Sequence, residues 1–359
     1  MARRQGLVTD SVAEAKAKNR LSDKGYHPFY EFPYDAARFH QIMQMTPKSC
    51  YYRNIFIGND NFVGDHKFSM EEIRRILITG ASGFVGGRVC HELCKRYELI
   101  TPSHSELDVT SAEDVAGFVA QVKPDIILHL AAISNTGYCE EHPDESYLVN
   151  VVSVENLARS AASHGAKLVW FSSDQVYNGN LELGLLSEDI TVSPENHYGR
   201  HKLLAEERSL ALCPDTVALR ATWMYDDLRP GMKTHGNFVL NFHNAIKNGT
   251  PLRFATREFR GITWVDEVVR NIPFTFELPG GVYNFGAENN LNTYETACEY
   301  ARILSCNPKE LVIADTERFA EHIRNISISM QKAYEASEGK IHFLNTLDGL
   351  AAFEGVHKV

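Results

Sequence analysis

The sequence predicts an α/β protein with a doubly wound parallel sheet. Short apolar runs of strand length alternate along the chain with longer segments of helical periodicity, the order that helical crossovers between parallel strands require. The first such run, Ile76 to Ile78, leads directly into a glycine-rich turn. A later run ends in two serines, at the edge of the sheet where open α/β folds bind their ligands.

The turn after the first run carries glycines at positions 80, 83 and 86, and a helical pattern follows to Leu93. Gly80 permits a tight turn, Gly83 lets backbone N–H groups approach a pyrophosphate, and Gly86 lets the helix pack closely on the strand. The N-terminus of that helix offers further N–H groups to phosphates. An ordinary βα turn with three glycines is the alternative. The predicted dinucleotide contacts here are Gly80, Ser82, Gly83, Phe84, Val85 and Gly86.

The second predicted strand, Leu99 to Pro102, decides which nicotinamide dinucleotide is preferred. An acidic side chain at its end would bind the ribose 2′-hydroxyl of NAD, but Ser103 and His104 follow instead. Without a carboxylate to repel a 2′-phosphate, and with Ser103, His104 or Arg88 to contact one, NADP(H) is favoured and NAD(H) stays open. The predicted cofactor contacts on this side are Ser103, His104, Asp108 and Val109.

A capping box at Thr110–Glu113 is expected to begin the next helix. A third strand follows over Pro124–Ala132, and a helical pattern runs from about Asp144 to His164. Small residues at the end of this strand would let its backbone lie against a cofactor. His129, inside the apolar run, is better explained as a hydrogen-bonded core residue than as a ligand. The predicted cofactor contacts are Leu130, Ala131, Ala132, Ser134 and Asn150.

A fourth strand, Lys167 to Ser172, leads into Ser173, and Tyr198 and Lys202 follow on a predicted helix. A tyrosine and a lysine four residues apart lie on one face of a helix. A phenol has an ordinary pKa of about 10 and is a poor acid near neutrality, but a neighbouring ammonium lowers that pKa. Tyr-x-x-x-Lys alone is common by chance. Its position behind the glycine turn and the two serines favours a catalytic set of Ser173, Tyr198 and Lys202.

Composition excludes several classes of protein. The chain has 359 residues, which suits two domains or one large domain with an appendage. Its net charge of −10 argues against a partner that is nucleic acid or an anionic membrane. Its seven cysteines show no metal-ligand spacing, so no metal site and a reducing cytoplasm are expected. No apolar run is long enough to span a membrane.

These features together resemble the extended short-chain dehydrogenase/reductase family, which has a Rossmann fold, and within it the dTDP-4-dehydrorhamnose reductases. The likeness covers about residues 73–270 and continues weakly to the end through Arg324-Asn-Ile-Ser-Ile-Ser. The first 70 residues lie outside it. The stretches that carry it are Gly80–Gly86, Ser105–Val109, His129–Ala132, Ser172–Gly179, Tyr198–Lys202 and Leu219–Tyr225.

The resemblance implies an NAD(P)H-dependent reductase of a nucleotide-linked 4-keto sugar. Tyr198 would protonate the C4 oxygen as hydride arrives, and Lys202 would orient the nicotinamide ribose and lower the pKa of Tyr198. Ser173 stands where these reductases usually carry threonine, which keeps the hydroxyl. Trp223 matches a tryptophan of the sugar pocket, with a core aromatic as the alternative. Ser172, Tyr198 and Lys202 complete the implied cofactor site.

The pair Asp174-Gln175 departs from a related pattern. Sugar-nucleotide 4,6-dehydratases resemble this strand end but carry Asp-Glu, and the glutamate removes a proton from C5. An amide cannot take that proton, so reduction or 4-epimerisation is favoured over dehydration. A non-catalytic NADP-binding regulatory subunit, such as that of methionine adenosyltransferase, is a further alternative. The expected substrate contacts are Ser173, Asp174, Gln175, Trp223, Arg257 and Arg260.

We divide the chain into an N-terminal arm over 1–72, an NAD(P)-binding domain over 73–235 and a mainly substrate-binding domain with a tail over 236–359. The aromatic-rich arm should pack on the main domain or on a second subunit, as a structural arm, a lid or a partner surface. After residue 235, Arg257 and Arg260 are expected to meet the diphosphate of the substrate or else to be solvated surface charge. A homodimer is the family's expected assembly.

Overall fold

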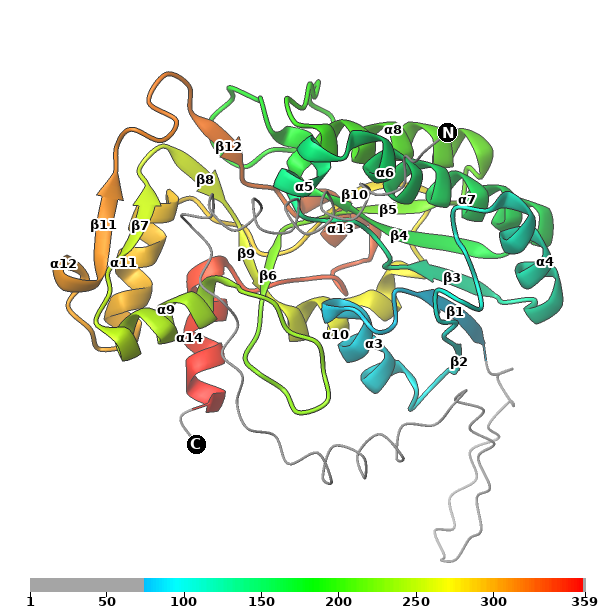
Figure 1. The fold of residues 1–359 in the computed structure, drawn as a ribbon, viewed down its shortest axis with the longest axis horizontal. Helices are drawn as coiled ribbons and strands as arrows, with labels where there is room; N and C mark the ends of the chain where they lie inside the picture. The colour runs from blue at the N-terminus through cyan, green and yellow to red at the C-terminus, as the bar shows by residue number, and fades with distance from the viewer. Residues whose placement is uncertain (1–73, 358–359) are drawn as a thin grey trace, which may run out of the picture. The chain divides into compact units, whose positions relative to one another are not determined.

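The computed structural model describes residues 74–357, so the expectation for the arm lies outside the described residues. A parallel six-stranded sheet in the order β10-β5-β4-β3-β1-β2 forms the centre (Figure 1). Its strands are β1 (Arg75–Thr79), β2 (Glu98–Ile100), β3 (Ile126–His129), β4 (Lys167–Ser173), β5 (Val217–Ala221) and β10 (Gly281–Phe285). The predicted doubly wound sheet is confirmed, and its switch point lies between β1 and β3, where such folds bind ligands.

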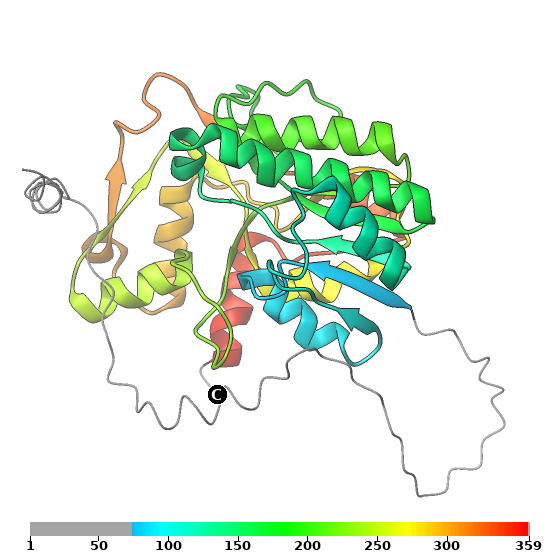
Figure 2. The ribbon, with the colours of Figure 1, turned by 45° about the vertical axis from the view of Figure 1, so that its right-hand side comes forward.

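Helices cover both faces of this sheet (Figures 1 and 2). On one face lie α4 (Ala112–Val122), α7 (Ser153–His164) and α8 (His197–Leu212), and on the other lie α3 (Phe84–Leu93) and α10 (Val265–Thr275). Alternation along β1 explains the two cores. Ile76 and Ile78 join the core beneath α3 and α10, whereas Leu77 joins the core beneath α4 and α7.

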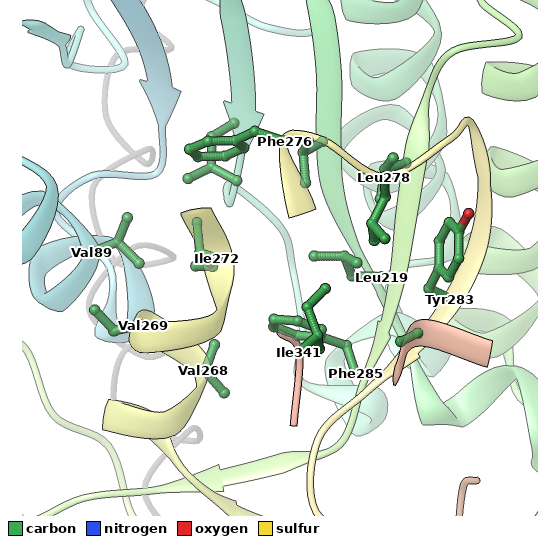
Figure 3. Packing of buried hydrophobic residues seen from close by; sticks show 14 of the residues in the cluster. Val89, Leu219, Val268, Val269, Ile272, Phe276, Leu278, Tyr283, Phe285 and Ile341 are labelled. Atoms are coloured by element: carbon green, nitrogen blue, oxygen red, sulfur yellow. The ribbon is translucent and has the colours of Figure 1, made fainter. Parts of the chain in front are cut away.

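The core beneath α3 and α10 joins segments that are far apart in the sequence. Figure 3 shows Val89 of α3 beside Val269 of α10, with Leu219 of β5 and Phe285 of β10 nearby. Val89, Leu219 and Phe285 are fully buried. Complete burial of an apolar side chain of this size contributes about 1.5–3 kcal/mol. The sheet and α10 therefore form one packed unit although the chain between them is long.

The chain returns to the central sheet after residue 235. Both α10 and β10 lie beyond that position and belong to the sheet and its cover. The predicted domain boundary at residue 235 stays a prediction. Whatever its exact place, α10 and β10 lie after it in the sequence but pack with the central sheet.

The remaining elements build a second layer around three short parallel pairs. The pairs are β6 (Trp223–Tyr225) with β9 (Ile262–Trp264), β7 (Leu252–Ala255) with β11 (Val312–Asp315), and β8 (Glu258–Arg260) with β12 (Arg324–Ile326). The helix α13 (Gln331–Ala336) packs against β10 of the central sheet. The helices of the second layer are α9 (Phe238–Asn248), α11 (Thr293–Ile303), α12 (Pro308–Leu311) and α14 (Thr346–His357). Phe238, Phe242 and Tyr300 are central to the core that holds them together.

Two local predictions need correction. The helix α4 begins after Ser111, whose hydroxyl accepts from the backbone N–H of Asp114 at 3.2 Å, and Thr110 instead binds Asp108. The capping box predicted at Thr110–Glu113 is therefore wrong by one residue. The single helix expected before His164 is broken into α5 (Thr136–Glu141), α6 (Pro143–Tyr147), a π-helical turn over Leu148–Val152, and α7.

Candidate active site

The end of β4 lies against the face of α8 that carries Tyr198 and Lys202. The ammonium of Lys202 donates to the carbonyl oxygen of Phe171 at 2.8 Å, and the side chain of Ser173 is hydrogen-bonded to Tyr198. The N-terminus of α8 is capped by Asn196, whose side-chain oxygen accepts from the N–H of Gly199 at 2.6 Å. The structure thus brings the three predicted catalytic side chains together, and all three are buried.

Burial sets the pKa values of this group. Loss of solvent raises the pKa of the Tyr198 phenol, and a hydrogen bond from Ser173 opposes that rise. The same loss of solvent lowers the pKa of Lys202 to about 8. The expectation that the ammonium lowers the pKa of the phenol is therefore wrong for the chain by itself, because desolvation raises that pKa and Lys202 is not among the groups that lower it. At physiological pH this phenol stays protonated, so it can donate its proton to a substrate oxygen on which negative charge develops.

The glycine turn forms a cradle that only glycine fits. Gly80 has a φ of 72°, and a Cβ there would lie 2.5 Å from the backbone nitrogen of Ala131. A Cβ on Gly86 would overlap the carbonyl oxygen of Gly80. The helix α3 begins after Gly83 with no described side chain capping it, so its first N–H groups face outward for a ligand. Of the predicted neighbours, Phe84 is buried, Val85 and Ala131 are half-buried, and Ser82 is exposed.

Arg88, which the sequence suggested as a contact of the cofactor 2′-phosphate, is instead bound within the protein. Its side chain is buried and donates from Nε to Asp226 at 2.6 Å and from Nη1 to the carbonyl oxygen of Phe84 at 2.7 Å. The guanidinium also lies 4.2 Å from the centre of the Phe84 ring. This arginine fixes α3 against the chain after β6, and the idea that it contacts a 2′-phosphate is wrong.

The end of β2 does carry a carboxylate. Glu106 accepts from the backbone N–H and from the hydroxyl of Ser103, both at 2.8 Å, and these bonds lower the pKa of Glu106. Ser103 and His104 are both exposed. The sequence reasoning missed this carboxylate because it considered only the three residues that follow the strand, whereas a turn brings Glu106 back to Ser103.

Several predicted cofactor residues use their side chains within the protein. Asn150 binds both the N–H and the carbonyl oxygen of Ile133, at 3.2 and 3.0 Å, and so holds the loop that carries Leu130, Ala132 and Ser134. Asp108 accepts from Thr110 at 2.7 Å. The carbonyl oxygen of Val109 accepts from Asn156 at 3.1 Å, and the hydroxyl of Ser172 donates to Glu206. Their side chains therefore shape the site rather than project from it.

His129 is a satisfied core residue, as expected. Its Nδ1 pairs with the Thr79 hydroxyl at 2.6 Å, and its Nε2 pairs with the Ser153 hydroxyl at 3.2 Å. Complete burial, together with the charge of Lys202, lowers its pKa to about 3. The ring is neutral at physiological pH and links the ends of β1 and β3 to α7.

Two arginines converge on the residues that follow Ser173. Nη2 of Arg260 lies 3.3 Å from Oδ2 of Asp174, and Nη2 of Arg324 donates to Oε1 of Gln175 at 2.8 Å. Arg324 also pairs with Glu258 and donates to Asn178. Asp174 is buried, which raises its pKa although both arginines oppose the rise. Sequence reasoning did not assign Arg324, since only the pairing of β12 with β8 brings it to this place.

The remaining predicted substrate residues differ in position. The ring of Trp223 lies 5.0 Å from the Arg260 guanidinium and packs edge-on against Phe238. Trp223 therefore lies beside the arginine cluster, half-buried. Arg257 instead donates to the carbonyl oxygen of Ala320 at 2.7 Å, so its side chain is directed to the loop after β11. The structure does not bring Arg257 to the end of β4.

Two findings concern what residues 74–357 lack. None of their helices combines the length and the apolar character needed to cross a membrane. No group of three or more histidine, cysteine, aspartate or glutamate side chains gathers there in a way that could hold a metal ion.

Comparison with known proteins gives the chain a family. The model of the RmlD substrate binding domain matches residues 74–342. A dTDP-4-dehydrorhamnose reductase of Aggregatibacter actinomycetemcomitans is 28% identical over 232 residues, which are 62% of this chain and 76% of that protein. Methionine adenosyltransferase 2 subunit beta of Xenopus tropicalis is 34% identical over 163 residues, 43% of this chain and 48% of that protein.

A solved structure supports the fold. The crystal structure of dTDP-4-dehydrorhamnose reductase from Bacillus anthracis, in complex with NADP, superposes with a TM-score of 0.69. The superposition covers 79% of this chain and all of that one, at 22% sequence identity. Similarity at this level of identity establishes the architecture that surrounds the site.

Proposed function

The chain belongs to the RmlD substrate binding domain family, and from this premise we propose that it is an NADP(H)-dependent reductase of a nucleotide-linked 4-keto sugar. The observation that carries the proposal is the meeting of Ser173, Tyr198 and Lys202 at the carboxyl edge of β4, beside the switch point of the sheet. Open α/β folds bind ligands at such points.

The described residues fit a dinucleotide. Gly80 and Gly86 allow the tight turn that packs the start of α3 against β1 and Ala131, and Gly83 leaves the backbone before α3 without a side chain. The N-terminus of α3 can supply N–H donors and a positive dipole end to a pyrophosphate. When bound, the cofactor supplies the hydride. The NADP of the Bacillus anthracis structure favours NADP(H). Because Glu106 lies at the end of β2, where it would repel a 2′-phosphate, NAD(H) remains the alternative.

The chain's own residues would bind and protonate the substrate carbonyl. The Ser173 side chain interacts with Tyr198, and in the proposed reaction the two hydroxyls would hydrogen-bond to the C4 oxygen and polarise it. The neutral phenol of Tyr198 donates its proton to that oxygen as negative charge develops on it. Lys202, held by the carbonyl oxygen of Phe171, lies one helical turn away to orient the ribose and to stabilise the phenolate that remains.

Gln175 argues against dehydration. Its side-chain oxygen accepts from Arg324 at 2.8 Å and from Asn196 at 3.2 Å, and its amide nitrogen lies 3.4 Å from Asp174. An amide in this position has no basic atom to remove a proton from C5. The proposal is therefore a simple reduction, and 4-epimerisation is the nearest alternative.

The likeness to methionine adenosyltransferase 2 subunit beta favours one second candidate, a non-catalytic cofactor-binding subunit. The two candidates differ in whether Tyr198 reacts. The cysteine spacing of the sequence, which indicates a reducing compartment, suits either candidate, and we also propose a cytoplasmic location.

The test is oxidation of NADPH at 340 nm by purified protein with dTDP-4-keto-6-deoxyglucose and related keto-sugar nucleotides. We expect turnover, and we expect Tyr198→Phe to lower kcat by roughly 10²–10⁴-fold, the usual contribution of a general acid, with NADPH affinity kept. Cofactor binding without turnover of any keto sugar, and with no effect of Tyr198→Phe, would favour the non-catalytic subunit.

A further inference from the structure

A buried ion pair lies directly behind the catalytic side chains. Glu206 of α8 accepts from Arg220 of β5 through both oxygens, with Nη2 to Oε2 at 2.7 Å and Nε to Oε1 at 3.0 Å. The hydroxyl of Ser172 donates to the same carboxylate. Both charged side chains are almost wholly removed from solvent. A bidentate pair of this kind has a fixed geometry as well as a favourable energy.

The position of Glu206 repeats the spacing of the catalytic residues. Tyr198, Lys202 and Glu206 are four residues apart along α8 and therefore share one face of the helix. On β4, three consecutive residues receive them: Ser173 meets the tyrosine, the carbonyl oxygen of Phe171 meets the lysine, and Ser172 meets the glutamate. The contact of Glu206 thus fixes the register of α8 along the end of β4.

The pair is also anchored to β10. Nη1 of Arg220 donates to the Tyr177 hydroxyl at 2.9 Å, and that hydroxyl donates to Asn284 of β10 at 2.9 Å. The guanidinium also lies 4.9 Å from the centre of the Tyr177 ring. The carboxylate of Glu206 is therefore held from β4, β5 and β10 together, and it cannot move without disturbing all three strands.

We propose that Glu206, fixed by Arg220, is a positioning residue of the active site that sets α8 on β4 and supplies the counter-charge to the Lys202 ammonium. The inference rests on the proposed reductase function, because it assigns Glu206 to the same site. It goes beyond the set of Ser173, Tyr198 and Lys202 by explaining what holds that set in register and what keeps its lysine charged.

The electrostatic half of the proposal depends on the surroundings of Lys202. Burial lowers the pKa of Lys202 to about 8, and Cys139 and then Glu206 act in the opposite direction. Burial raises the pKa of the Cys139 thiol, so Glu206 is the one of these two groups that carries a full negative charge near neutral pH. The titratable groups that interact with this lysine are Tyr198 and Glu206 on α8, Cys139 on α5 and His129 on β3. One step further out, Asp174 acts on Tyr198 and Arg220 pairs with Glu206. Among them, Glu206 is a carboxylate on the same helix face, one turn away.

The test measures the pKa of Lys202 directly, without relying on turnover. In protein labelled with ¹³C at the lysine ε-carbon, the signal of Lys202 is identified by its loss in Lys202→Arg. Glu206→Gln keeps the shape of the side chain and a hydrogen-bond acceptor but removes the charge. We expect the pKa of Lys202 to fall by roughly one unit, the size of effect a nearby counter-charge has. We also expect the alkaline limb of the kcat profile to move down with it.

A matched control separates a specific effect on Lys202 from a general loss of stability. Asp226→Asn breaks the other fully buried ion pair, with Arg88, away from α8. Both variants should lose stability, since an unpaired buried charge is costly, but only Glu206→Gln should move the pKa of Lys202. If Glu206→Gln does not fold, the pair Glu206→Gln with Arg220→Met removes both charges. It should still lower the pKa of Lys202, but by less, because the loss of the Arg220 cation acts in the opposite direction.

An unchanged pKa of Lys202 in the glutamate variants, or an equal change in Asp226→Asn, would overturn the proposal. Failure of the wild-type protein to reduce any keto sugar would contradict the proposed function instead, and it would leave the titration of Lys202 unaffected.

Discussion

At the scale of single residues, burial decides which charges the site can hold. Desolvation raises the pKa of Tyr198, lowers that of Lys202 to about 8 and lowers that of His129 to about 3. The phenol and the imidazole are therefore neutral near pH 7, and Lys202 is the titrating group closest to that pH. A neutral phenol suits the donation of a proton, which is what reduction of a carbonyl requires.

The buried imidazole of His129 should make stability depend on pH. Its pKa lies below the ordinary 6.5, so its contribution is complete above pH 6.5 and is lost as the pH falls toward 3. We expect the free energy of unfolding of wild type, minus that of His129→Gln, to fall by up to about 1.4 kcal/mol per pH unit in this window. Urea unfolding of both proteins between pH 4 and 8 measures it. A difference that does not vary with pH would contradict the assignment.

Glu106 should set the choice of cofactor. Its carboxylate lies at the end of β2, bound to the N–H and hydroxyl of Ser103, where a ribose 2′-substituent is read in this fold. We expect Glu106→Gln to tighten NADPH binding relative to NADH, because the repulsion of the 2′-phosphate is removed. Fluorescence titrations with both dinucleotides measure the ratio. As a control, Glu113→Gln removes a carboxylate from the first turn of α4 and should leave the ratio unchanged.

Residue types and spacing could predict that Tyr198 and Lys202 lie together, because four residues of helix place them on one face. They could not predict Arg324, which reaches Gln175 only through the pairing of β12 with β8. They also could not predict that Arg88 forms an ion pair with Asp226, a residue 138 positions away. Charged side chains with distant partners are invisible to local patterns.

At the scale of elements, β1 and α3 are joined by a glycine turn in which the surrounding backbone leaves no space for a side chain at positions 80 and 86. The apolar runs and the glycine spacing were enough to predict this unit. The helices after it were predicted in position but not in detail. Thr110 and Ser111 are both suitable caps, and Thr110 binds Asp108 instead. The π-helical turn at Leu148–Val152 is held by a contact of Asn150 with the loop at Ile133. The return of β10 to the sheet depends on long-range packing, and the sequence pattern does not reveal it.

Two glycines in helices should respond oppositely to alanine. A Cβ on Gly86 would overlap the carbonyl oxygen of Gly80, whereas a Cβ on Gly117 of α4 would meet nothing within 4 Å. We expect Gly86→Ala to destabilise the protein and to weaken NADPH binding. We expect Gly117→Ala to stabilise it by about 0.5–1 kcal/mol, the usual gain in a helix. Thermal unfolding measures both. Equal effects of the two changes would contradict the close approach of α3 to β1.

At the scale of the whole described unit, the second layer meets the central sheet through arginines. Arg260 of β8 reaches Asp174 and also lies beside Trp223. Arg324 of β12 reaches Gln175 and also pairs with Glu258. In the proposed reaction, Asp174 and Gln175 would link substrate binding to the reacting carbonyl. A substrate held by the second layer would be presented to Ser173 and Tyr198 by the same contacts.

Removing Arg324 should affect the sugar nucleotide and not the cofactor. We expect Arg324→Met to raise the KM for the keto-sugar nucleotide at least tenfold, because Gln175, Asn178 and Glu258 lose their shared partner. The dissociation constant of NADPH should not change. Arg253→Met, which removes an exposed arginine from β7, is the matched control and should leave the KM as it is. An equal rise of KM in both variants would count against a specific role for Arg324.

The central claim is that hydride passes to a sugar carbonyl held at Ser173 and Tyr198. The most direct measurement uses NADPH that carries deuterium at C4 of the nicotinamide, with a 4-keto-6-deoxy sugar nucleotide as substrate and NMR of the product. The account predicts deuterium at C4 of the reduced sugar with wild type, and at least a hundredfold slower labelling with Tyr198→Phe. Product without deuterium, or labelling at the same rate in Tyr198→Phe, would contradict it.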